Sequence, residues 1–354
     1  MESTRRRLLR TGAVTGLAGV AGCLGVLGGD GGDEPDGGTA DERPDGVYVQ
    51  PFVEEMATAG TAEVGDYAFG VMWTTTHRFW TPTQDELSEQ PAAGSVHLMS
   101  VVWDPETRTV LPESGLSVEI YRDDALVSQE VIYPMLSQRM GFHYGANFEL
   151  DGDGTYEVRP SVAGTSVRRT GAFEGRFGEP ATAAVEMTFT DATREQVSTR
   201  EIDQGGQPGA VEPMDTPMPR STVPAVDDLP GRTLGTVSVD GADLGSVFLP
   251  PTEAGRFTDG RGYLAVVAAT PYNRTVLPAM GIEATLEREG DVVAEGSLER
   301  TLDPDLGYHY GLPVDAEAVG DAALTLSVTT PPQVSRHQGY ETAFVETGTA
   351  TVEG

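Results

Sequence analysis

The chain has 354 residues and a formal net charge of −32, because 55 Asp and Glu residues oppose only 23 basic ones. All of the basic residues are Arg and none is Lys. A surface this acidic repels itself unless dense salt screens it, so the composition indicates a halophile's protein. It also argues against nucleic-acid binding, because a phosphate backbone requires a basic surface.

The first 23 residues predict an export signal that ends in a lipid anchor. Arg5 and Arg6 belong to a twin-arginine motif, and residues 11–22 follow as an uncharged stretch that is too short for a bilayer, which needs about 20 residues. Small residues then precede Cys23, the chain's only cysteine, in the pattern that a lipoprotein signal peptidase cleaves. We therefore expect an exported protein, held at the outer face of the cytoplasmic membrane by a lipid on Cys23. A lone cysteine excludes disulfides within the chain.

Composition divides the rest of the chain into two linkers and two domains. Residues 24–46 are mostly Gly, Asp, Glu and Pro, with almost nothing to bury, and predict a disordered tether. A second stretch, 194–230, is rich in Gly and Pro and is expected to be a linker. It separates a first domain, 47–193, from a second domain, 231–354, and each is long enough to form its own core.

The two domains are predicted to be copies of each other. The sequence RTVLP at 108–112 recurs at 274–278, and GFHYG at 141–145 recurs as GYHYG at 307–311. Both matches have an offset of 166 residues, so the alignment runs between them without a gap. A tandem duplication explains this better than chance does, and we expect the copies to form an intramolecular pseudo-dimer.

Within each copy, apolar residues alternate with others at a period of two. Leu116, Val118 and Ile120, for example, alternate with Ser117 and Glu119. Successive side chains of a strand point to opposite faces, so this pattern predicts short strands. Many such strands, separated by Gly, Pro and Asp turns and with no convincing amphipathic helix, predict an all-β fold with a β-sandwich in each copy.

Histidine and methionine residues stand out on two of the predicted strands. His97 and Met99 lie two residues apart and therefore point to the same face, while Met135 and Met140 shortly precede His143. If the two segments pair, imidazole and thioether ligands gather, and these suit copper, particularly Cu(I), provided that the imidazoles are neutral. The alternative is that His97 and Met99 are core residues and that His143 is a hydrogen-bonded structural histidine.

Several motifs resemble those of the periplasmic iron-transport-associated family. They are His97-Leu98-Met99, Pro134-Met135, residues 141–147 (GFHYGAN), Arg336-His337 and residues 346–348 (ETG). The resemblance covers most of residues 47–190 and, more weakly, 231–354. It implies two tandem immunoglobulin-like β-sandwich domains of a kind that dimerises, binds copper through His and Met, and assists iron uptake beside a membrane permease.

The ligand positions of this family are divided between the two copies. The first copy has Met99 where the family has Glu, and Arg169 where the last His belongs. The second copy keeps His309 and His337. At its other ligand positions stand Tyr263, Ala265 and Thr301. Neither copy alone therefore holds a complete set.

This complementary loss suggests one composite metal site shared by the two copies. Its proposed ligands are His97, Met99, Met135, His143 and His337. The twin site around His309 would then be a relic, and Met140 is a secondary candidate. Ligand bonds are about 2 Å long, so the hypothesis requires His337 to lie within about 10 Å of His143.

These observations predict a lipid-anchored surface protein that binds copper or iron and assists iron transport, with an iron permease as a potential partner. The alternative is a surface binding or scaffold protein that has lost its metal site. An enzyme is not expected, because no nucleophile, general base or catalytic carboxylate pair stands in a recognisable context. Asn273 begins a glycosylation sequon, although the two residues after it belong to the repeat.

Overall fold

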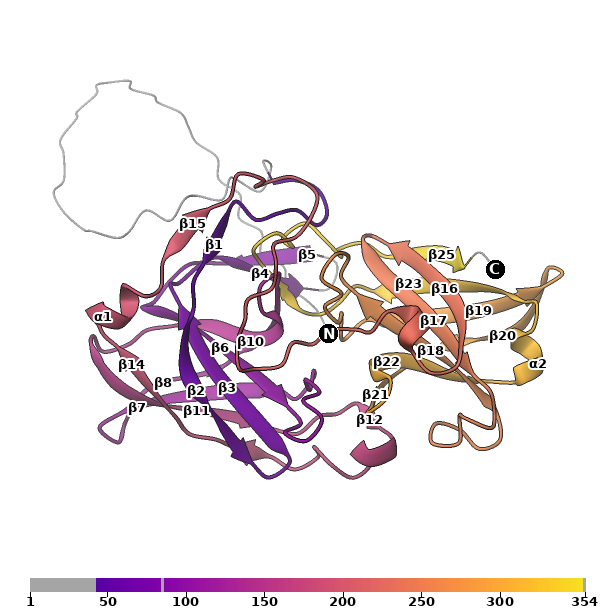
Figure 1. Cartoon of the computed structure of the whole chain (residues 1–354), viewed down its shortest axis with the longest axis horizontal. Coiled ribbons are helices and arrows are strands. Elements are labelled where there is room, and N and C mark those ends of the chain that lie inside the picture. The colour runs from indigo at the N-terminus through magenta and orange to yellow at the C-terminus, as the bar shows by residue number, and fades with distance from the viewer. Residues whose placement is uncertain (1–42, 84–85, 353–354) are drawn as a thin grey trace, which may run out of the picture. The chain divides into compact units, whose positions relative to one another are not determined.

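The computed structural model describes residues 43–83 and 86–352, and strands make up nearly all of its regular structure (Figure 1). This confirms the all-β class that the alternating pattern predicts. The helical elements of the described part are short: α1 (Asp191–Arg194), α2 (Ala316–Val319), and the 3-10 turns η2 (Gly171–Phe173) and η3 (Val226–Asp228).

An eight-stranded sheet dominates the first half of the chain, residues 43–193. Its strand order is β2-β3-β6-β10-β9-β24-β4-β5. The strands are β2 (Ala57–Val64), β3 (Tyr67–Thr74), β4 (Phe79–Thr83), β5 (Glu86–Gln90), β6 (Val96–Trp103), β9 (Tyr133–Ser137), β10 (Gly141–Phe148) and β24 (Ser335–Arg336). A second sheet of this half has the order β13-β11-β7-β8, with β14 also paired to β11. These strands are β7 (Leu116–Arg122), β8 (Ala125–Val131), β11 (Gly154–Val162), β13 (Ala181–Thr182) and β14 (Val185–Phe189).

Two sheets also build the second half, residues 231–352. The six-stranded sheet has the order β12-β21-β22-β18-β17-β16, and the four-stranded sheet has the order β20-β19-β23-β25. The first consists of β12 (Arg168–Arg169), β16 (Arg232–Val239), β17 (Ala242–Leu249), β18 (Gly262–Ala269), β21 (Glu299–Asp303) and β22 (Gly307–Val314). The other consists of β19 (Gly281–Arg288), β20 (Asp291–Ser297), β23 (Ala323–Thr330) and β25 (Gly348–Val352).

The two halves exchange short strands with each other. β24, from the second half, lies between β9 and β4 and pairs in parallel with β9, with Ser335 opposite Met135. β12, from the first half, pairs in parallel with β21, with Arg168 opposite Thr301. Each half therefore completes a sheet of the other, and the described residues form one compact unit.

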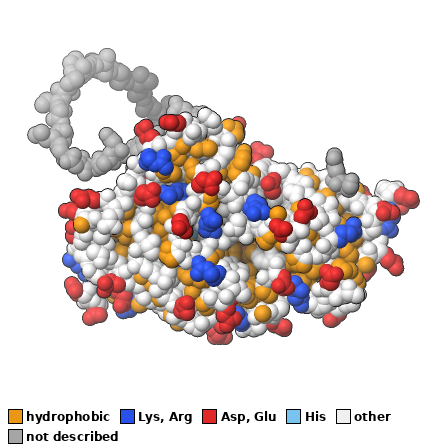
Figure 2. All heavy atoms as spheres, viewed as in Figure 1, with side chains coloured by type: hydrophobic (Ala, Val, Ile, Leu, Met, Phe, Trp, Pro, Cys, Tyr) orange, Lys and Arg blue, Asp and Glu red, His pale blue; other side chains and the backbone are white. Residues whose placement is uncertain are grey.

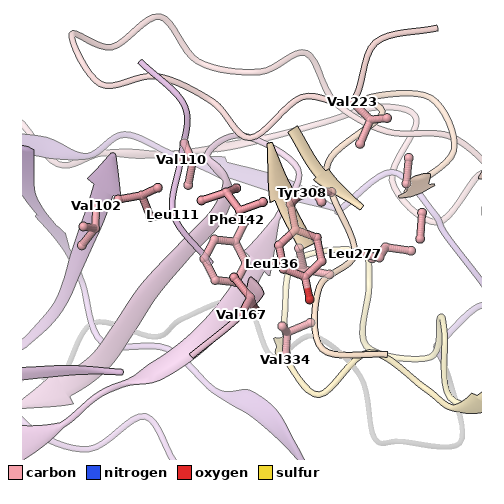
Figure 3. Close-up of a cluster of buried hydrophobic side chains, with 14 of the residues drawn as sticks. Val102, Val110, Leu111, Leu136, Phe142, Val167, Val223, Leu277, Tyr308 and Val334 are labelled. Carbon is pink, nitrogen blue, oxygen red and sulfur yellow. The ribbon is translucent and has the colours of Figure 1, made fainter. Parts of the chain in front are cut away.

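Apolar side chains from both halves form one continuous buried cluster. Figure 3 shows Leu136 and Phe142 of the first half, and Leu277, Tyr308 and Val334 of the second, among its members. Because burial of apolar surface is the main favourable term in folding, this shared cluster ties the stability of one half to that of the other.

The expected linker, residues 194–230, packs along the two halves. β15 (Thr199–Glu201) pairs with β1 (Phe52–Glu54). Further along, Met218 is buried, and its sulfur lies 2.2 Å from where a side chain on Gly70 would begin. The carbonyl of Val211 accepts a hydrogen bond from the Asn273 side chain, whose nitrogen also donates to the backbone of the first half. Thus the glycosylation sequon's amide nitrogen is engaged in hydrogen bonds.

Acidic and basic side chains are interspersed on the face shown in Figure 2. Among the described residues, Arg256 binds Asp303 with two hydrogen bonds from its guanidinium and also pairs with Asp305. The planar guanidinium suits such two-point contacts with carboxylates, which gives one physical reason for using Arg throughout.

The predicted signal residues Arg5 and Arg6 and the predicted lipidation site Cys23 lie outside the described residues. Within residues 43–83 and 86–352, no helix has the length and apolar character needed to cross a bilayer.

Candidate metal centre

Strand pairing places the predicted ligands of the first half on one face of the eight-stranded sheet. β6 and β10 are antiparallel neighbours, with His97 opposite Asn147, and β10 and β9 pair with His143 opposite Met135. Directly opposed side chains point to the same face, and so do residues two apart on one strand. His97, His143 and Met135 therefore share a face. Gly145 lies on the same face of β10, between His143 and the Asn147 that is opposite His97.

The fifth predicted ligand, His337, reaches this face from the second half. It follows directly after β24, which the exchange of strands holds beside β9. Its ring centre lies 5.7 Å from that of His143 and 6.1 Å from that of His97. The separation is well inside the limit that a shared site requires.

Gly145 creates the space that the thioether and one imidazole share. A side chain starting at Gly145 would come within 2.8 Å of Met135 Sδ and 2.9 Å of His97 Nε2. Both atoms therefore border the same small volume above the glycine. Because it has no side chain, Gly145 leaves this volume to the two donor atoms.

The other two predicted thioethers belong to the apolar core. Met99 is fully buried in this core, and it lies between Met72 of β3 and Gly145 of β10. Met140, in the turn between β9 and β10, is also buried in the shared apolar cluster. Of the predicted methionines, Met135 is the one whose sulfur is among the atoms nearest to where a side chain on Gly145 would begin.

A fourth imidazole, His77, joins the cluster from the connection between β3 and β4. Its ring centre lies 4.0 Å from that of His97 and 4.8 Å from that of His337. The motif resemblance did not include His77, and its position after a strand gave no periodic signal. The sole hint in the sequence was a histidine within an otherwise apolar and threonine-rich stretch.

The proton positions of three rings follow from their hydrogen bonds. The Asn147 side-chain nitrogen donates to the carbonyls of His77 and Pro91, so its oxygen must face His97 Nδ1, which lies 2.8 Å away. His97 therefore carries its proton on Nδ1. The Nδ1 atoms of His143 and His77 likewise face the carbonyls of Gly141 and Thr75, which can only accept.

In consequence, the Nε2 atom of each of these three rings carries a lone pair that has no hydrogen-bond partner. Nε2 of His77, His97 and His143 is buried and makes no hydrogen bond, and neither ring nitrogen of His337 makes one. Burial favours the neutral rings: it lowers the pKa of His77 and of His143 to about 4, and holds the pKa of His97 and of His337 well below the ordinary value. Buried polar atoms normally find partners, so five unpaired nitrogens in one place require an explanation.

The second half contains the same framework with its polar atoms satisfied. His309 Nδ1 faces the carbonyl of Gly307, as in the first half, but its Nε2 lies 3.2 Å from the hydroxyl of Tyr263. Tyr263 stands at the position of His97 and fills the space above Gly311, since a side chain there would begin 1.7 Å from its hydroxyl. The predicted relic is thus closed by a tyrosine.

Register also identifies the counterpart of His337. Because Arg168 lies opposite Thr301 as Ser335 lies opposite Met135, Thr170 takes the place of His337, one residue after the Arg169 that the sequence alignment suggested. The hydroxyl of Thr170 donates to the buried carboxylate of Asp303.

The first-half cluster fits a soft or borderline metal ion by the chemistry of its donors. Neutral imidazoles and a thioether are ligands that copper accepts. Within residues 43–83 and 86–352, however, no group of three or more His, Cys, Asp or Glu side chains is arranged as a preformed site. Instead the rings pack against one another: His77 stacks on His337 and is tilted by 38° against His97. Binding an ion therefore requires rings to turn, and the His337 ring, which no hydrogen bond holds, is the freest to do so.

Comparisons with known proteins gave the following results. No curated protein matches the sequence. Among solved structures, copper-bound FetP from uropathogenic Escherichia coli has 20% identity and a TM-score of 0.32, and covers 38% of this chain and 97% of its own. Copper-bound P19 from Campylobacter jejuni has 17% identity and a TM-score of 0.31, and covers 38% of this chain and 98% of its own. A family model for a domain of unknown function, DUF7350, matches residues 227–353, which form the second half of the chain.

Proposed function

We propose that this protein is a copper-binding protein with one metal site, formed by the first-half cluster and completed by His337. The observation that carries the proposal is the set of five buried ring nitrogens without partners. The same framework in the second half leaves none of its corresponding atoms in this state, because Tyr263 pairs with His309. A bound ion explains why one half keeps bare imidazoles where the other has replaced them.

His97, Met135, His143 and His337 are the residues that would hold the ion. The ion would supply a centre for ligand bonds, and the protein's residues would hold the imidazoles neutral and orient them. Asn147 has such a role, because its oxygen fixes the proton of His97 on the nitrogen that points away from the cluster. Outer hydrogen bonds of this kind are a regular feature of histidine ligands.

The site's enclosure favours binding or storage over catalysis. The four histidines are between 0% and 5% exposed, and Met135 is fully buried, so the donor atoms are shielded from molecules in the solvent. We therefore place the protein among metal-binding rather than catalytic proteins. An exported, lipid-anchored location and a part in iron transport belong to the same proposal, and they rest on the N-terminal signal and on the family motifs of the sequence.

Metal-free protein is expected to take up one equivalent of copper and to lose this capacity when His337 is replaced by Ala. The protein is dialysed against a chelator, loaded with Cu(I) without oxygen or with Cu(II) in air, and analysed for copper per chain. His309→Ala is the matched control, because it removes an equally buried histidine of the same half whose two ring nitrogens already have partners in Gly307 and Tyr263. Failure of the unmodified protein to bind copper would leave the alternative of a surface protein without a metal site.

A further inference from the structure

His77 lies at the middle of the imidazole cluster. Its ring contacts that of His97 from the same half and stacks on that of His337 from the other, at 27° between planes. Only 5% of His77 is exposed to solvent. The ring thus bridges the parts of the site that the two halves contribute.

One ring nitrogen of His77 faces hydrogen-bond acceptors, and the other has no hydrogen-bond partner. Nδ1 lies 3.3 Å from the carbonyl of Thr75 and 3.6 Å from a carboxyl oxygen of Glu54. Both neighbours are acceptors, so the proton belongs on Nδ1. Nε2 is buried and has no hydrogen-bond partner. A carboxyl group behind an imidazole whose far nitrogen is free is the usual surrounding of a histidine ligand.

Glu54 connects His77 to the segment that carries His337. The carboxyl group is 1% exposed and accepts one hydrogen bond from the Thr75 hydroxyl and another from the side chain of Gln338. Thr75 belongs to the connection that presents His77, and Gln338 directly follows His337. A single buried side chain therefore fixes the positions of two imidazole-bearing segments relative to each other.

The corresponding place in the second half contains a ring that cannot bind metal. There Phe257 stacks on Tyr263 with ring centres 4.3 Å apart, and His77 packs against His97 with ring centres 4.0 Å apart. Packing alone is thus satisfied by phenylalanine at this place. An imidazole with a bare nitrogen in the half that holds the other imidazoles indicates a role beyond packing.

We infer that His77 is a fourth imidazole ligand of the copper site and that Glu54 is its positioning residue. This inference rests on the copper-binding function proposed above and adds a nitrogen donor to it. Cu(II) prefers a set of several nitrogen or oxygen donors, whereas thioethers suit Cu(I). With His77, the donors comprise four imidazoles and one thioether, so the site holds Cu(II) as well as Cu(I).

The test is His77→Phe, which gives the first half the ring that the second half already packs at this place. Cu(II) affinity is expected to fall at least about 10-fold, with a smaller fall in Cu(I) affinity, each measured by competition with a chelator of known affinity. The electron paramagnetic resonance spectrum of the Cu(II) protein is expected to show coupling to one fewer nitrogen. Glu54→Gln replaces the carboxylate behind His77 by an amide, which keeps one of the two oxygens that accept from Thr75 and Gln338, and it is expected to weaken Cu(II) binding less than His77→Phe does.

The outcomes separate this inference from the proposed function. If the unmodified protein binds copper and His77→Phe keeps both its Cu(II) affinity and its spectrum, His77 is not a ligand although the copper site stands. If the unmodified protein binds no copper, the proposed function itself fails. His309→Ala, with its histidine in the closed twin site, is expected to leave affinity and spectrum unchanged.

Discussion

The metal-free protein is expected to lose several kcal/mol of stability as the pH falls from 7 to about 4.5. The pKa of His77 and of His143 is about 4 in the folded protein, against about 6.5 in an unfolded chain. At a pH between these two pKa values, the histidines bind protons in the unfolded state but not in the folded state, so acid favours unfolding. Each of the two residues contributes about 2–3 kcal/mol to the loss by pH 4.5, and His97 and His337 act in the same direction.

Two buried carboxylates lose their contribution to stability in stronger acid than this. Asp104 and Asp303 are held ionised by hydrogen bonds, which lower their pKa below 3.8, so their contribution is lost only in stronger acid. Urea titrations at pH 7, 6, 5 and 4.5 measure the effect. A free energy of unfolding that stays constant between pH 6.5 and 4.5 would contradict buried neutral imidazoles. Copper is expected to raise the free energy of unfolding at pH 7, because an ion that binds only the folded state stabilises it.

The sequence was sufficient to predict the all-β class and which side chains share a face. Alternation along single strands is a local property, so the shared face of His97 and Met99 followed from their spacing alone. Alternation does not say where on that face the polar cluster ends and the apolar core begins. Met99 faces the same side as His97 and lies between Met72 and Gly145, yet it belongs to the apolar cluster, which its spacing alone does not reveal.

The sequence alone could not place residues in connections or predict the pairing of distant strands. His77 follows the last residues of β3 in a connection, where no period fixes the direction of a side chain. The role of Asn147 depends on the register between β6 and β10, which places it opposite His97, 50 positions away in the sequence. The exchange of β12 and β24 is a long-range pairing of two-residue strands, too short to carry any pattern of their own.

Alanine at the equivalent positions Gly145 and Gly311 is expected to have different effects: the first change lowers copper affinity and the second lowers stability. Neither has a positive φ, so alanine fits the backbone at both places. In Gly145→Ala, the new methyl group would lie 2.8 Å from Met135 Sδ and 2.9 Å from His97 Nε2. Met135 Sδ lies near the end of a flexible side chain, so stability is expected to fall less than in Gly311→Ala. The displaced donors no longer share one space, and copper affinity is expected to fall about 10- to 100-fold.

Gly311→Ala is expected to lower the stability of the protein and to leave its copper affinity unchanged. Its methyl group would lie 1.7 Å from the Tyr263 hydroxyl and 2.0 Å from the ring carbon that bears it. The ring cannot step aside, because it stacks on Phe257 and its hydroxyl is bonded to His309. Overpacking of this kind costs about 1–3 kcal/mol, and copper affinity is expected to remain unchanged. Copper competition and urea denaturation on both variants measure the contrast. Equal copper affinities for the two variants would mean that the space above Gly145 holds no metal, whatever the bare nitrogens around it suggest.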